Sequence, residues 1–190
     1  MNIIELKSPY TDQVAKFNWQ VSQLTIFDGS NEIINAIRFL CSDLEPFNNF
    51  LAQHIQPQTF KSCEQMRSLC DKFNQLVDDG PKRQRASTEM ASADLIKFVL
   101  QTTYNRAVVE PEKLNQYEPF SPQVYGETSN DLVDQMLKKV ALKETDVFID
   151  LGSGVGNVVL QVAATVRCKR CYGIEKADWP AYYAEVSAHL

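Results

Sequence analysis

One segment of this 190-residue sequence, Val147–Glu175, restricts the folds open to the chain more than any other. Val147–Ile149 is a short continuous apolar run, as expected for a strand that is buried on both faces. Three glycines follow within Gly152–Gly156, Val158–Val166 has helical spacing, and Cys171–Glu175 has the composition of a second strand. Because a strand, a glycine turn, a helix and a strand make up a βαβ unit, we expect two parallel strands joined by a right-handed crossover.

The residues before this unit have mainly helical spacing. The first thirty residues predict an irregular or short-strand lead-in, and apolar residues from Ser30 onward predict a helix that Pro46 helps to end. A second predicted helix runs from about Phe60 to Gly80, and a third approaches Tyr104. We therefore predict a mainly helical part over residues 1–110.

The last eighty residues are predicted to form a different kind of domain. Pro111–Tyr125 predicts a loop with one helical turn, because it contains three prolines. Thr128 or Ser129 can cap a short amphipathic helix before the βαβ unit, and Pro180 suits the first turn of a last helix. Residues 111–190 would thus hold a loop and the first βαβ unit of an α/β sheet.

Composition excludes several classes of protein. With 19 Lys and Arg against 24 Asp and Glu, the net charge is −5, which argues against nucleic-acid binding through the whole surface. No apolar run is long enough to cross a bilayer, so no membrane association is expected. The five cysteines do not form a disulfide framework, and Cys168 and Cys171 have no second ligand pair, so no metal site is predicted.

The glycine turn lies where open α/β sheets bind ligands, at the carboxyl end of the first strand. A dinucleotide site requires glycine at the sixth position of the fingerprint, where this chain has Asn157, which disfavours a dehydrogenase that uses NAD. S-adenosylmethionine fits better, since its methionine end can lie over Gly152 and Gly154 while Glu175 accepts both ribose hydroxyl protons. The structural alternative is a tight turn beside a solvated acid.

Several strings resemble one family, the disruptor-of-telomeric-silencing proteins, which are non-SET histone methyltransferases. The strings are Tyr117–Ser129, Asp150–Gly156, Val158–Ala164 and Tyr172–Asp178, and Ser68–Asn74 and Pro111–Asn115 extend the match into the helical part. The resemblance is dense from Pro111 to Ala184 and is specific, because a generic methyltransferase would share only the glycine turn and Glu175. It implies the start of a class I (Rossmann-like) methyltransferase sheet, truncated after its second strand, so that the chain is expected to be the N-terminal part of a catalytic domain.

The resemblance also implies roles for particular residues in binding S-adenosylmethionine. Tyr125, Glu127 and Thr128 would line a loop over the methionine end, and Asp150 and Gly152 would lie against its amino group. Glu175 would hold the ribose. Asn157 stands where the family commonly has glutamine, and no general base is evident, so the catalytic residues stay unassigned.

By the same resemblance, the reaction would be methyl transfer to lysine seventy-nine of histone H3, with the nucleosome as partner and the nucleus as location. The alternative is a truncated, non-catalytic module that binds chromatin or cofactor. Lys82, Arg83 and Arg85 are either a solvated connector or a local contact to nucleosomal DNA.

Overall fold

The computed structural model of the chain forms two compact units, Met1–Thr88 and Glu89–Leu190. The structure describes residues 3–9, 12–19, 29–42, 45–54, 62–80, 91–116 and 125–190. The basic stretch Lys82–Arg85 and most of the loop string, residues 117–124, lie outside these described residues.

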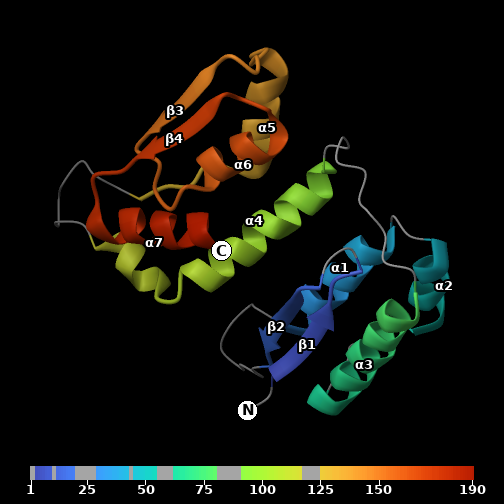
Figure 1. Cartoon of the computed structure of the whole chain (residues 1–190). Coiled ribbons are helices and arrows are strands. Elements are labelled where there is room, and N and C mark those ends of the chain that lie inside the picture. The colour runs from blue at the N-terminus through green and yellow to red at the C-terminus, as the bar shows by residue number, and fades with distance from the viewer. Residues whose placement is uncertain are drawn as a thin grey trace. The chain divides into compact units, whose positions relative to one another are not determined.

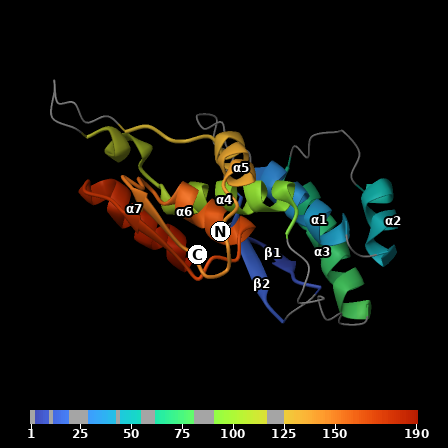
Figure 2. The same cartoon turned by 90° about the horizontal axis from the view of Figure 1, so that it is seen from above.

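Among the residues that the structure describes, the first unit combines a β-hairpin with three helices. Strands β1 (Ile3–Lys7) and β2 (Val14–Asn18) pair antiparallel, and helices α1 (Gly29–Ser42), α2 (Glu45–His54) and α3 (Cys63–Asp79) follow. Strand β1 packs against α3, as Figures 1 and 2 both show. The core buries apolar side chains from all five elements, among them Ile4, Phe17, Ile37, Phe50 and Phe73.

Two of the three helices in this unit follow the predicted spacing, whereas α2 was not predicted. Helix α3 begins after Ser62, whose Oγ accepts from the Gln65 N–H, and ends at Gly80, as expected. Pro46 does not end a helix but lies in the first turn of α2, where its missing N–H removes no helical hydrogen bond. The apolar side chains of Phe47 and Phe50 then bury α2 in the core.

The described residues of the second unit form five helical segments and a two-stranded sheet. They are α4 (Ala93–Ala107), the 3₁₀ helix η1 (Pro111–Asn115), α5 (Asn130–Lys139), β3 (Val147–Leu151), α6 (Asn157–Thr165), β4 (Arg170–Ile174) and α7 (Asp178–His189). Strands β3 and β4 are parallel, with Ile149 opposite Tyr172. Helices and strands alternate in this unit as the sequence predicts, so it has an α/β architecture.

Helix α4 packs with the C-terminal unit, although the predicted boundary lies after residue 110, whereas η1 packs with that unit as predicted. Helix α4 contacts α6 and α7, and η1 contacts α7. Ala107 and Leu114 are buried in one cluster with Val155 and Tyr183, which explains why the boundary between the units falls earlier, between Thr88 and Glu89.

The strand burial differs from the prediction. Helix α6 packs against both β3 and β4, and Figure 1 shows α5 beside α6. On the other face of the sheet, nothing among the described residues covers the apolar side chains: Ile149 is 53% exposed and Leu151 76%. Leu132 and Met136 of α5 are also exposed, while Val133 is buried. The apolar runs therefore predicted the elements correctly but not their burial on both sides.

Candidate functional site

The turn after β3 depends on three glycines that adopt left-handed backbone conformations. Gly152, Gly154 and Gly156 have φ angles of 83°, 54° and 85°, which other L-residues rarely adopt. The N–H groups of Gly152 and Ser153 donate to the carbonyl of Ile174, at 2.8 and 3.2 Å, and fasten the turn to the end of β4. The turn is thus a fixed feature of the sheet edge.

Gly173 in β4 is required by the same turn, although the sequence analysis gave it no role. A Cβ at this position would lie 2.7 Å from Ser153 Oγ and 2.9 Å from Ser153 Cβ. The turn therefore folds onto bare backbone near the carboxyl end of β4. A glycine inside a predicted strand was the available sequence signal, because such a glycine often marks a close approach of another backbone.

The carboxylate of Glu175 joins the glycine turn to the residues that follow β4. Its Oε2 accepts from the Gly154 N–H at 2.8 Å, and its Oε1 accepts from the N–H groups of Lys176 and Ala177, also at 2.8 Å. A carboxylate has about four acceptor positions. Among the described residues, one position, on Oε2, has no partner and is open to a ligand.

Asp150 lies at the other strand end, next to Glu175. Burial raises the pKa of the Asp150 carboxyl, and the negative charge of Glu175 raises it further. The negative charge of Glu175 disfavours the ionised form of Asp150, so a cationic ligand group near Asp150 would relieve this cost. This part of the site favours a ligand that carries positive charge.

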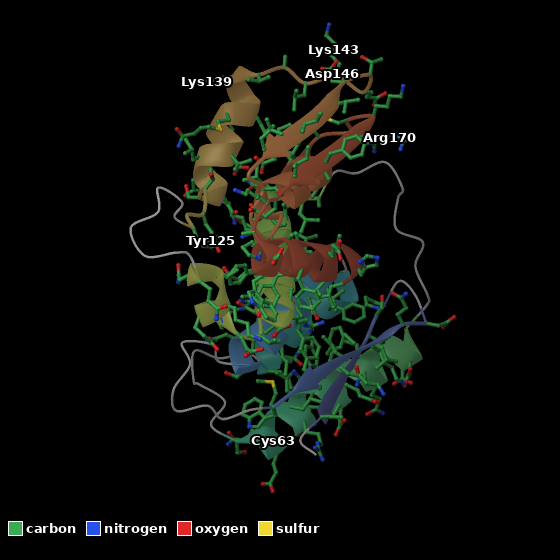
Figure 3. All side chains as sticks on the ribbon, turned by 90° about the vertical axis from the view of Figure 1, so that its left-hand side faces the viewer. Cys63, Tyr125, Lys139, Lys143, Asp146 and Arg170 are labelled. Atoms are coloured by element: carbon green, nitrogen blue, oxygen red, sulfur yellow. The ribbon has the colours of Figure 1, made fainter. Side chains whose placement is uncertain are left out.

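Tyr125 packs its ring on the glycine turn and is held there by Glu127. The Tyr125 hydroxyl donates to Glu127 Oε1 at 2.7 Å. A Cβ on Gly154 would lie 3.2 Å from Tyr125 Cε2, so ring and backbone are close. Burial, followed by the hydrogen bond to Glu127, raises the pKa of Tyr125. Figure 3 shows Tyr125 well away from Asp146 and Arg170, which mark the opposite end of the strands.

Tyr104 on α4 is a member of the site that the sequence analysis missed. Burial raises its pKa to about 12, with further contributions from the charge of Glu127 and a hydrogen bond to it. Glu127 is thus hydrogen-bonded to two phenols, from α4 and from the segment before α5. The sequence carried no local signal for Tyr104, because the contact joins residues 23 positions apart.

The remaining predicted site residues, Thr128 and Asn157, are not part of this network of contacts. Thr128 is exposed, and the neighbouring Ser129 caps α5, accepting from the Leu132 N–H at 3.3 Å. Asn157 is the half-buried first residue of α6. Among the described residues, the network therefore brings together Tyr125, Glu127, Asp150, Glu175 and the glycine turn, but not Thr128 or Asn157.

The described part of the chain contains no group of three or more His, Cys, Asp or Glu side chains arranged to hold a metal. Cys168 and Cys171 are within hydrogen-bonding reach of each other, and burial is the main cause that raises the pKa of Cys171. No helix among the described residues has the length and apolarity to span a bilayer.

Comparison with known proteins shows a family match for the region that contains this site. Residues 104–190 match the family described as histone methylation protein DOT1. This part of the chain belongs to the DOT1 family. The match begins at Tyr104 and includes the glycine turn, Glu175 and α7.

Curated relatives extend the similarity into the first unit. A protein from Drosophila melanogaster, named histone-lysine N-methyltransferase, H3 lysine-79 specific, is 46% identical over 166 residues, which cover 83% of this chain. Proteins with the same name from Kluyveromyces lactis and Caenorhabditis elegans are 35% and 37% identical over 60% and 50% of the chain. The chain spans 9%, 21% and 10% of the lengths of these three relatives.

Proposed function

We propose that this chain carries part of the S-adenosylmethionine site of a histone-lysine N-methyltransferase that acts on lysine 79 of histone H3, as the names of the relatives state for those proteins. In this proposal the two-stranded sheet is the start of a class I (Rossmann-like) methyltransferase sheet. The nucleosome would be the substrate, and the nucleus the place of action.

The observation that carries the proposal is the arrangement of two carboxylates around the glycine turn. Glu175 is oriented by the Gly154 N–H and keeps one acceptor position open, and Asp150 lies close enough for the two charges to interact. S-adenosylmethionine offers partners for both acids, since it has a ribose diol, an ammonium and a sulfonium. A phosphate-bearing dinucleotide would instead bring negative charge to this acidic edge.

Different residues of the chain would bind different parts of the cofactor. Glu175 would accept one ribose hydroxyl directly at its open Oε2 position, and a second hydroxyl would have to share an acceptor with a backbone N–H. Asp150 and Gly152 would lie at the methionine amino group. Tyr125, Glu127 and Thr128 would belong to the loop over the methionine end, and Gly154 and Asn157 would lie beneath the cofactor at the start of α6.

When bound, S-adenosylmethionine supplies a methyl group on a sulfonium, which a neutral lysine amine can displace in line without a covalent enzyme intermediate. The residues of this chain would bind and orient the cofactor and exclude water from it. None of the described residues is assigned as a general base.

Calorimetric titration of S-adenosylhomocysteine into the parent, Glu175→Gln and Glu175→Ala proteins tests the proposal. A hydrogen bond to a charged acceptor contributes about 1.5–3 kcal/mol, so Glu175→Ala is expected to weaken binding roughly ten- to a hundredfold. Glu175→Gln keeps one acceptor oxygen and should fall between the two. Equal affinities for all three proteins would refute the assignment of Glu175 to the ribose.

A non-catalytic module that binds chromatin or cofactor is the second candidate, and the uncovered apolar face of β3 and β4 favours it, because such a face suits binding to another polypeptide. Transfer of a radiolabelled methyl group from S-adenosylmethionine to nucleosomes separates the two candidates. Labelled histone H3 supports the enzyme, whereas cofactor binding without label, in a protein that spans the length of the curated relatives, supports the module. Lys82, Arg83 and Arg85 stay a proposed contact to nucleosomal DNA.

A further inference from the structure

Two tyrosines that are distant in sequence hydrogen-bond to one carboxylate beside the glycine turn. Tyr125 donates its hydroxyl to Glu127 at 2.7 Å, and Tyr104 hydrogen-bonds to the same side chain. Glu127 itself is exposed. An exposed glutamate ordinarily samples several rotamers, and two phenol donors would restrict it to one.

Tyr104 has a firmer support than Glu127 or Tyr125. It lies in the last turn of α4, where its carbonyl accepts from the Val108 N–H at 2.8 Å. Its ring and the ring of Tyr125 pack against one buried cluster, formed by Ala107, Val108, Leu114, Val155 and Tyr183. The Tyr104 hydroxyl is therefore held by a helix and a core.

The contacts continue from Glu127 to Glu175, the acid that is predicted to bind the ribose. The Tyr125 ring lies against Gly154, and the Gly154 N–H donates to Glu175 Oε2 at 2.8 Å. Gly154 has a φ of 54° and no side chain to fix its own position. The aromatic ring above it and the carboxylate bonded to its N–H both restrain this peptide, and the Tyr125 hydroxyl also has a hydrogen bond with the backbone of Val155.

We propose that Tyr104 is a positioning residue of the cofactor site: through Glu127 it holds the Tyr125 ring on Gly154, and so fixes the peptide that orients Glu175. The role in cofactor binding rests on the proposed function, whereas the restraint on the turn does not. Glu127 is then a bridge between two tyrosines and acts on the cofactor through them.

The test compares Tyr104→Phe and Glu127→Gln with the double variant and with Tyr182→Phe. Tyr104→Phe keeps the packed ring and removes only the hydroxyl. Tyr182 on α7 is exposed, and its hydroxyl makes no hydrogen bond to any described residue, so it is the matched control. Hydrogen exchange of the peptides that contain Tyr125–Thr128 and Gly152–Val155 is measured, together with calorimetric affinity for S-adenosylhomocysteine.

We expect Tyr104→Phe to speed hydrogen exchange in both peptides by roughly three- to tenfold and to weaken the binding of S-adenosylhomocysteine by a similar factor. The reason is that only part of the free energy of one charge-assisted hydrogen bond acts on the turn. Tyr182→Phe should change neither. The double variant should exchange no faster and bind S-adenosylhomocysteine no more weakly than Glu127→Gln, because both substitutions break the same link between Tyr104 and Tyr125. Additive losses would overturn the proposal.

Exchange rates separate this proposal from the proposed function. If the parent does not bind S-adenosylhomocysteine but Tyr104→Phe still speeds exchange at Gly152–Val155, the restraint stands and the cofactor assignment fails. If Tyr104→Phe exchanges and binds like the parent, Tyr104 is only a core residue and the proposal is wrong.

Discussion

Asp150 and Glu175 are carboxylates at the ends of neighbouring strands, but their surroundings differ. Glu175 accepts three backbone N–H bonds. Burial and the charge of Glu175 instead raise the pKa of Asp150, so its negative charge opposes folding. A residue that costs stability at a candidate binding site is expected where a ligand supplies the missing partner.

Asp150→Asn should therefore be more stable than the parent at neutral pH but bind S-adenosylhomocysteine less well. A carboxyl whose pKa is raised on folding takes up protons in the folded state, so stability falls as the pH rises above about 3.9, the ordinary aspartate value, through the folded pKa. Asp150→Asn lacks this loss of stability, so its higher stability relative to the parent should disappear at acid pH. Denaturant unfolding at neutral and acid pH measures the difference.

Glu144→Gln is the matched control for this prediction. It removes the same charge from an exposed loop side chain, and it should leave the unfolding free energy at neutral pH close to that of the parent. If Asp150→Asn is less stable than the parent at neutral pH, the charge of Asp150 contributes to folding, and burial beside Glu175 does not make that charge unfavourable.

At the scale of the elements, the periodicity of apolar residues predicted the secondary structure better than it predicted which faces are buried. The spacing of apolar residues located α1 and α3, and the βαβ unit follows from Val147–Glu175. It missed α2, where Pro46 signals a helix start as readily as a helix end. The one-sided exposure of β3 could not be predicted, because an apolar run does not say which neighbours will cover it.

The same limit applies to the candidate site. Asp150 and Glu175 could be predicted because the carboxyl ends of parallel strands lie at one edge of a sheet. Tyr104 and Gly173 could not be assigned, since their roles arise only where α4 meets Glu127 and where the glycine turn folds onto β4. Contacts of this kind depend on the tertiary fold.

Gly173→Ala tests the packing of the turn on β4. The added Cβ would meet Ser153 Oγ at 2.7 Å and Ser153 Cβ at 2.9 Å, and Ser153 is buried, so the turn must shift. Overpacking of this kind costs about 1–3 kcal/mol of unfolding free energy. Urea denaturation should show this loss, with weaker binding of S-adenosylhomocysteine.

Gly126→Ala provides the control for this loss, because nothing lies within 4 Å of a Cβ at that position. Its unfolding free energy should stay close to that of the parent. A Gly173→Ala protein as stable as Gly126→Ala would mean that the turn does not need bare backbone in β4.

At the scale of the whole molecule, the two units have separate cores. The cluster around Phe73 in the first unit and the cluster around Tyr183 in the second share no residue. Phe73 and Tyr183 are 0% and 1% exposed, so truncation of either side chain leaves a cavity inside one unit only. Unfolding by two separable units is the expected consequence.

Phe73→Ala should therefore destabilise the first unit by about 3–5 kcal/mol and leave the second largely unchanged. Hydrogen exchange measures this directly: amides of α1 and α3 should exchange faster, whereas those of β3, β4 and α6 should keep the rates of the parent. Tyr183→Ala should produce the reverse pattern, because its cavity lies beside Val155 and the glycine turn. If either substitution speeds exchange in both units alike, the chain unfolds as one cooperative structure, and a mutation in the first unit would then disturb the candidate site through stability alone.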